Sequence, residues 1–125
     1  MATWQKLEVE RAVDPRSHAT MFRLKGVLTD SDEGLEFFET VRAEARAKPG
    51  SIVINLRDVD YITSAGVGVL ASCYTSAMRS GANLALAELQ TRPRAELRVV
   101  RLLTVIPEFE TEQAALAAVT TPTQP

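Results

Sequence analysis

The sequence predicts an α/β domain with a mixed β-sheet of about four to five strands and about four α-helices, which pack as a single layer on one face. Short runs with the apolar patterns of strands alternate with longer segments of helical spacing. Helices between strands imply crossover connections and therefore a partly parallel sheet. The length of 125 residues suits one domain, and 46% apolar with 24% charged residues is an ordinary globular composition.

Two strands open the predicted order. Leu7 and Val9 alternate with polar residues, and residues 14–17 form a turn. Residues 20–25 alternate again, and Gly26 ends this second strand.

The first helix is predicted from its capping residues and its apolar spacing. Asp30 is placed at the cap and Glu33 at the position of a capping-box partner. The helix ends at residues 48–50. Its core face is expected to contain Leu35, Phe38, Val41 and Ala45.

A buried strand and the central helix come next. Residues 52–56 form a continuous apolar run, which is typical of a strand buried on both faces. The helix is predicted from Ser64 to Ser80. Its core face is expected to contain Val67, Leu70, Ala71, Tyr74 and Met78, and the nearby Cys73 is expected to be buried.

The last part of the chain completes the order β-β-α-β-α-β-α-(β)-α. Residues 84–87 are predicted as a short inner strand, and Pro93 opens a short helix that runs to about Leu102. Residues 106–109 are a strand or an extended link, and residues 111–119 form a last helix capped by Thr111. We expect one domain over residues 1–119 and a disordered tail over residues 120–125.

The composition also excludes several functions. A net charge of -2 provides no strong field for nucleic acid or an anionic membrane. No apolar stretch approaches the ~20 residues of a membrane-spanning helix, and residues 1–6 lack the pattern of a secretory signal. Cys73, the single cysteine, forms neither an internal disulfide nor a cysteine metal cage. We therefore expect a cytoplasmic protein that binds neither nucleic acid nor membrane.

The most informative stretch, residues 58–68, leads from the buried strand into the central helix. Thr63 or Ser64 is expected at the N-cap, where a hydroxyl accepts a hydrogen bond from a free backbone N–H. One interpretation is a cap alone, worth ~1 kcal/mol, and residue type by itself favours it. The other is a phosphorylation switch at Ser64, because a helix N-terminus accommodates the roughly -1.5 to -2 charges of a phosphate.

Residues 55–70 (Asn-Leu-Arg-Asp-Val-Asp-Tyr-Ile-Thr-Ser-Ala-Gly-Val-Gly-Val-Leu) resemble the central motif of STAS domains, the fold of anti-sigma-factor antagonists. The family pattern there is a buried strand, then Asp-Ser-Ser/Thr-Gly, then an apolar helix start. Residues 26–29 (Gly-Val-Leu-Thr) resemble the family's Gly-Glu-Leu/Ile-Asp after an early strand. Residues 102–109, with the alanine-rich segment 112–118, resemble its closing part.

This resemblance implies a non-catalytic, protein-binding regulator in a partner-switching pathway. The unphosphorylated form of such an antagonist binds an anti-sigma factor and frees a sigma factor. The anti-sigma factor's serine kinase activity then phosphorylates the antagonist and abolishes binding. The matching serine is Ser64, and no cofactor, metal or catalytic residue is implied. The implied partner-binding face consists of Thr63, Ser64, Ala65, Gly66, Thr29 and Asp30.

The chain departs from the family pattern at two positions. Thr63 stands where the family has an aspartate before the serine, and Thr29 stands where it has an aspartate after the early glycine. Both acids are usual on the kinase-binding face, and Asp30 is placed to substitute for the second. The two threonines favour a first alternative, a STAS-type structural subunit of a signalling or lipid-transport complex without phosphorylation.

A second alternative is a small nucleotide-binding domain. Residues 66–71 (Gly-Val-Gly-Val-Leu-Ala) fit the dinucleotide fingerprint, and Glu88 lies near the distance of a ribose-binding acid. The first glycine of that fingerprint belongs in a tight turn directly after its strand, whereas about ten residues separate Leu56 from Gly66. Close packing of helix on sheet explains these glycines better.

Overall fold

The computed structural model of the chain describes residues 6–47 and 50–120. These residues form five β-strands, four α-helices and one short 3-10 helix. Their order is β1 (Glu8–Val13), β2 (Thr20–Leu28), α1 (Asp32–Ala47), β3 (Ser51–Ile62), α2 (Ser64–Arg79), β4 (Asn83–Ala87), α3 (Thr91–Val99), η1 (Leu102–Thr104), β5 (Glu108–Phe109) and α4 (Glu112–Thr120). None of these helices combines the length and the apolar character that a membrane crossing requires.

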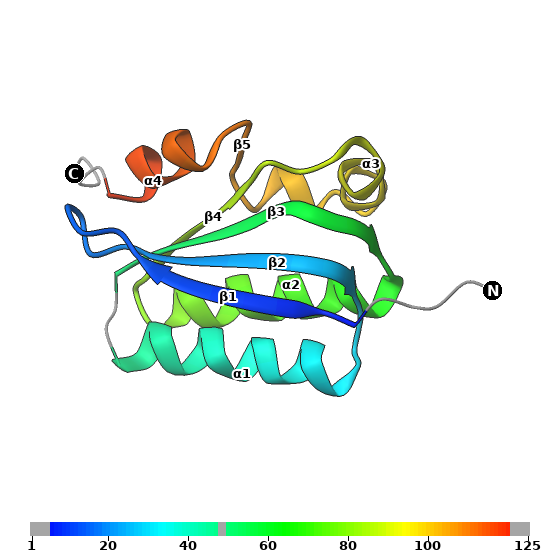
Figure 1. The fold of residues 1–125 in the computed structure, drawn as a ribbon, viewed down its shortest axis with the longest axis horizontal. Helices are drawn as coiled ribbons and strands as arrows, with labels where there is room; N and C mark the ends of the chain where they lie inside the picture. Colours follow the sequence, from blue (N-terminus) through cyan, green and yellow to red (C-terminus); the bar gives the residue numbers. More distant parts are fainter. Residues whose placement is uncertain (1–5, 48–49, 121–125) are drawn as a thin grey trace.

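The strands form one mixed sheet in the order β1-β2-β3-β4-β5. β1 pairs with β2 antiparallel, and every other neighbouring pair is parallel. The parallel pairs follow from the crossovers, because α1 connects β2 to β3 and α2 connects β3 to β4. Figure 1 shows α1 and α2 lying side by side against one face of the sheet. The predicted α/β class, the mixed sheet and the order of elements along the chain are confirmed.

The arrangement of the helices differs from the predicted single layer. α1 and α2 cover one face, whereas α4 lies across the opposite face against β3 and β4 (Figure 1). The reason is the apolar character of the central strands on both faces. Ile52 and Ile54 join the large core beneath α1 and α2, while Val53 and Ala85 join a smaller cluster with Ala115 of α4. A sheet that is apolar on both sides needs a cover on each.

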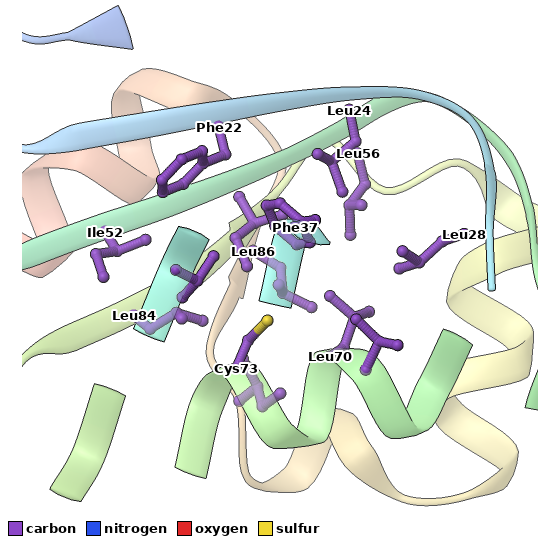
Figure 2. Packing of buried hydrophobic residues seen from close by; sticks show 14 of the residues in the cluster. Phe22, Leu24, Leu28, Phe37, Ile52, Leu56, Leu70, Cys73, Leu84 and Leu86 are labelled. Carbon is purple, nitrogen blue, oxygen red and sulfur yellow. The ribbon is translucent and has the colours of Figure 1, made fainter. Parts of the chain in front are cut away.

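The large core holds α1 and α2 on the sheet. Phe22 of β2 meets Phe37 of α1 edge to face, with ring centroids 5.6 Å apart at 80° (Figure 2). Leu70 and Cys73 approach the same cluster from α2, and all four side chains are fully buried. An edge-to-face pair adds about 0.5–1.5 kcal/mol to the free energy of burying the two rings.

Both long strands extend beyond their predicted ends. β2 continues past Gly26 to Leu28, and β3 continues past Leu56 to Ile62. Gly26 has a φ of 107°, and the pairing register of β2 with β3 shifts just after it. A glycine at positive φ permits this irregularity without ending the strand.

The helices differ from prediction mainly in which residues face the core. In α1 the predicted Val41 and Ala45 are buried, Phe38 is half-buried against the core beside the fully buried Phe37, and Leu35 is 50% exposed. In α2 the core face consists of Gly66, Val69, Leu70, Cys73 and Ala77, and the predicted Met78 is 52% exposed. The predicted Leu70 is buried, and Val67 and Tyr74 pack against the core while remaining half-buried. The rest of the α2 core face includes small side chains, which the spacing of large apolar residues does not reveal.

Two predicted ends in the last part of the chain shift slightly. α3 ends at Val99, before the predicted Leu102, because Arg101 adopts a left-handed conformation with a φ of 60°. α4 runs through Thr120, the first residue of the predicted tail, and residues 121–125 lie outside the described part of the chain.

Candidate functional site

Thr63 connects β3 to α2 and is the N-cap of that helix. Its Oγ1 accepts a hydrogen bond from the Gly66 backbone N–H at 3.0 Å, and its own N–H donates to the Leu28 carbonyl at 3.0 Å. The first bond stabilises the helix start by about 1 kcal/mol. The second fixes that start against the end of β2.

Thr63 and Thr29, the two positions at which the sequence departs from the pattern that it resembles, contact each other directly. The hydroxyl of Thr63 donates to Thr29 Oγ1 at 2.8 Å, and the hydroxyl of Thr29 donates to Asp30 Oδ1 at 3.3 Å. A continuous set of hydrogen bonds therefore runs from the α2 backbone through both threonines to the Asp30 carboxylate. Because all these groups are neutral apart from Asp30, the contact carries no repulsion between like charges.

Two glycines allow both helices to approach the end of β2. A Cβ on Gly66 would lie 2.1 Å from the Leu28 carbonyl oxygen, and a Cβ on Gly34 of α1 would lie 1.8 Å from that of Thr29. Real Cβ atoms do not approach backbone that closely. The first turns of α1 and α2 are thus brought together around residues 28 and 29.

Ser64 is the first residue of α2 and is exposed. In the described part of the chain no hydrogen bond engages its Oγ, and the first turn of α2 contains no acidic residue. The free backbone N–H groups and the dipole of the helix start favour a negative charge at this position. A phosphate on Ser64 is therefore compatible with the folded domain.

An open cavity of about 300 Å³ lies next to these residues. Its wall is mostly apolar and is lined by Lys6, Leu7, Val27, Thr29, Ser31, Glu33 and Thr63. The two threonines of the site thus form part of the cavity wall. The cavity is in the size range in which pockets begin to hold small ligands or single anchoring groups.

The structure brings the six sequence-predicted site residues into one region. Thr29, Asp30 and Thr63 are hydrogen-bonded neighbours. Ser64, Ala65 and Gly66 follow Thr63 in the first turn of α2, with Ser64 exposed, Ala65 half-buried and Gly66 buried.

One predicted role is wrong, because Asp30 does not cap α1. Ser31 does so, since its Oγ accepts from the Gly34 N–H at 3.2 Å. Asp30 remains exposed beside Thr29.

Sequence reasoning missed the cavity. The alternating pattern places Leu7 in the first predicted strand, and Val27 follows the predicted end of the second. In the structure Leu7 directly precedes β1 and Val27 lies in β2, and both line the cavity. Val27 does lie inside the Gly-Val-Leu-Thr motif, which was the one available signal. Nothing in the spacing of the sequence indicates that Leu7 and Val27 line one hollow with Thr63.

The glycine-rich segment is explained by packing at its first glycine. β3 runs to Ile62, so the expectation of about ten residues between strand and fingerprint is wrong, and only Thr63 separates β3 from α2. Gly66 lies inside the first turn of α2 and faces the Leu28 carbonyl, whereas a Cβ on Gly68 would meet open space. The bare Cα of Gly66 therefore faces protein backbone.

Comparison with known proteins gives one family and a consistent fold. The STAS domain profile matches residues 10–115, and none of the curated proteins matches the sequence. The structure of an anti-sigma factor antagonist from Mycobacterium paratuberculosis is similar, with a TM-score of 0.78 and 19% identity, over 93% of this chain and 96% of that one.

Two further solved structures share this architecture. SpoIIAA, a Bacillus cell fate determinant in its phosphorylated form, has a TM-score of 0.65 and 18% identity over 90% of this chain and 99% of that one. A sulfate transporter family protein from Wolinella succinogenes has a TM-score of 0.69 and 17% identity over 86% of this chain and 88% of that one. At these identities the similarity is one of fold.

Proposed function

Because the chain belongs to the STAS domain family, we propose that it is a non-catalytic, cytoplasmic regulator of the anti-sigma-factor-antagonist type. Its partner is an anti-sigma factor with serine kinase activity, and its switch is phosphorylation of Ser64. The partner-binding face consists of Thr63, Ser64, Ala65, Gly66, Thr29 and Asp30.

The exposed, unengaged hydroxyl of Ser64 at the first position of α2 carries this proposal. A kinase needs a hydroxyl that can leave the protein surface and enter its own active site. Thr63 is a poor acceptor because its hydroxyl caps α2 and bonds Thr29 at the same time. A phosphate on Ser64 adds roughly -1.5 to -2 charges to the binding face without unfolding the helix.

The test begins by copurifying the tagged protein with its partners from its native cells. Affinities of the identified partner are then measured for the wild type, Ser64→Ala and Ser64→Glu. Ser72→Glu is the matched control, because Ser72 is also exposed on α2 but two turns away. We expect Ser64→Ala to bind, Ser64→Glu to lose at least tenfold in affinity, and Ser72→Glu to behave as the wild type.

Incubation with the partner and ATP, followed by phosphopeptide mapping, locates the modified residue. Phosphate on Ser64 supports the proposal. Equal affinities of Ser64→Glu and Ser72→Glu, with no phosphate on Ser64, would reduce Ser64 to a helix-start residue without a switching role.

The pair Thr29 and Thr63 favours a second candidate, a structural subunit of a signalling or transport complex. Their direct hydrogen bond replaces the two acids that antagonists present to a kinase. Under this candidate a transport or scaffold complex copurifies in constant proportion, and its affinity does not respond to Ser64→Glu or to ATP.

A further inference from the structure

We propose that the cavity beside Thr29 and Thr63 is the anchor point of the partner, and that it receives one aliphatic or aromatic side chain flanked by a basic residue. This inference rests on the proposed function, since the side chain that enters the cavity belongs to the protein that binds the partner-binding face. It adds Leu7 and Val27 to that face as the residues that contact the anchor.

The size and the wall of the cavity suit a single apolar side chain. An apolar cavity of about 150 Å³ is already large enough to bind benzene, and this cavity measures about 300 Å³. Leu7 and Val27 supply apolar surface to a wall that is mostly apolar. Buried anchors of this kind in pockets near the centre of an interface usually dominate binding energy.

The charges around the cavity indicate the charge of the partner residue that lies beside the anchoring side chain. Glu33 lines the cavity, and Asp30 and Asp32 are exposed just before it. Within residues 6–47 and 50–120 no ion pair engages these three carboxylates. Among the described residues that line the cavity, Lys6 is the single cation. The local excess of negative charge favours a cationic group next to the apolar anchor.

The cavity lies next to the partner-binding face. Thr63 lines the cavity and is the residue directly before Ser64. A partner that covers Ser64 therefore lies within reach of the cavity mouth. Loss of the anchor and phosphorylation of Ser64 then weaken the same complex through different groups.

The first experiment tests the cavity without the partner. Toluene, benzylamine and benzoate carry the same ring with neutral, positive and negative charge, and each is titrated into methyl-labelled protein while NMR spectra are recorded. We expect the methyl signals of Leu7, Val27 and Thr63 to shift, with benzylamine binding more tightly than benzoate. Val27→Trp should abolish the shifts by filling the cavity. Val105→Trp is the control, because Val105 is 55% exposed and does not line the cavity.

The second experiment uses the partner identified by copurification. We expect Val27→Trp to lower its affinity at least tenfold and Val105→Trp to leave it unchanged, with both variants folded as judged by their spectra. Absence of ring binding, tighter binding of benzoate than of benzylamine, or unchanged partner affinity in Val27→Trp would each overturn the anchor proposal. The ring titration does not involve Ser64, so failure of the switch and failure of the anchor are distinguished.

Discussion

Placing aspartates at both family positions, Thr29 and Thr63, should introduce a repulsion that the present sequence avoids. The two hydroxyl oxygens lie 2.8 Å apart, so two carboxylates there carry charges about 4 Å apart. At an effective dielectric constant of about 20 their Coulomb energy is ~4 kcal/mol. Both residues are only half-buried, and rotation and solvent screening reduce the expected repulsion to about 1–2 kcal/mol.

A double-mutant cycle measures this repulsion. Thr63→Asp alone should stay within about 0.5 kcal/mol of the wild type, because aspartate caps a helix as well as threonine does. Urea unfolding of Thr29→Asp, Thr63→Asp and the double variant should give a coupling of about 1–2 kcal/mol near pH 7.

The pH dependence of the coupling has a definite sign. Each carboxylate raises the pKa of the other in the folded state, so the penalty is present above that raised pKa and disappears as the pH falls through it. The neutral cycle Thr29→Asn with Thr63→Asn is the control and should show no coupling. Additivity of the aspartates within about 0.5 kcal/mol at neutral pH would refute the direct contact on which the reasoning depends.

Three further predictions concern packing, pH and thiol reactivity. Gly66→Ala should destabilise the domain by about 3 kcal/mol or more, because the added Cβ collides with backbone. Gly68→Ala on the same helix should stabilise the domain by about 0.5–1 kcal/mol, because its Cβ meets open space. Equal effects of the two variants in urea unfolding would contradict this contrast. Hydrogen bonds from Arg23 lower the pKa of the Glu112 carboxyl. Above the ordinary glutamate pKa, the Glu112→Gln variant should therefore be about 1 kcal/mol less stable to unfolding than the wild type. This difference should vanish as the pH falls through the lowered pKa. Burial raises the pKa of the Cys73 thiol to about 12. A disulfide reagent should therefore modify Cys73 at the rate of global unfolding. Rapid labelling of the native protein would show that the Cys73 thiol is not buried.

Much of the fold was predictable because strands and crossovers leave simple patterns. The continuous run at residues 52–56 identified the central strand, and its two-sided burial is what places α4 opposite α1 and α2. The position of α4 was not predicted because this helix is short and alanine-rich. It adds the buried Ala115 and Val119 and the half-buried Leu116 to the small cluster. The core face of α2 was predicted only in part. Leu70 and Cys73 are buried as expected, whereas the burial of Gly66 and Ala77 was not predicted, because these residues are small.

The site was only partly predictable because its key contacts join distant segments. The position of Thr63 at a helix start follows from local sequence alone. Its bond to Thr29 spans 34 residues, and no local pattern records it. The cavity depends on β1 and β2 lying together beside the start of α2, which is a property of the tertiary structure.

The two faces of the sheet also differ in how firmly they hold their helices. α1 and α2 share a core with the largest buried side chains, whereas α4 rests on a cluster of six buried residues and on the bonds of Glu112 to Arg23 and Asn55. Local opening requires less free energy where fewer apolar contacts are lost. We therefore expect α4 to form a separate unit of hydrogen exchange, whose amides exchange while those of β2 and β3 remain protected.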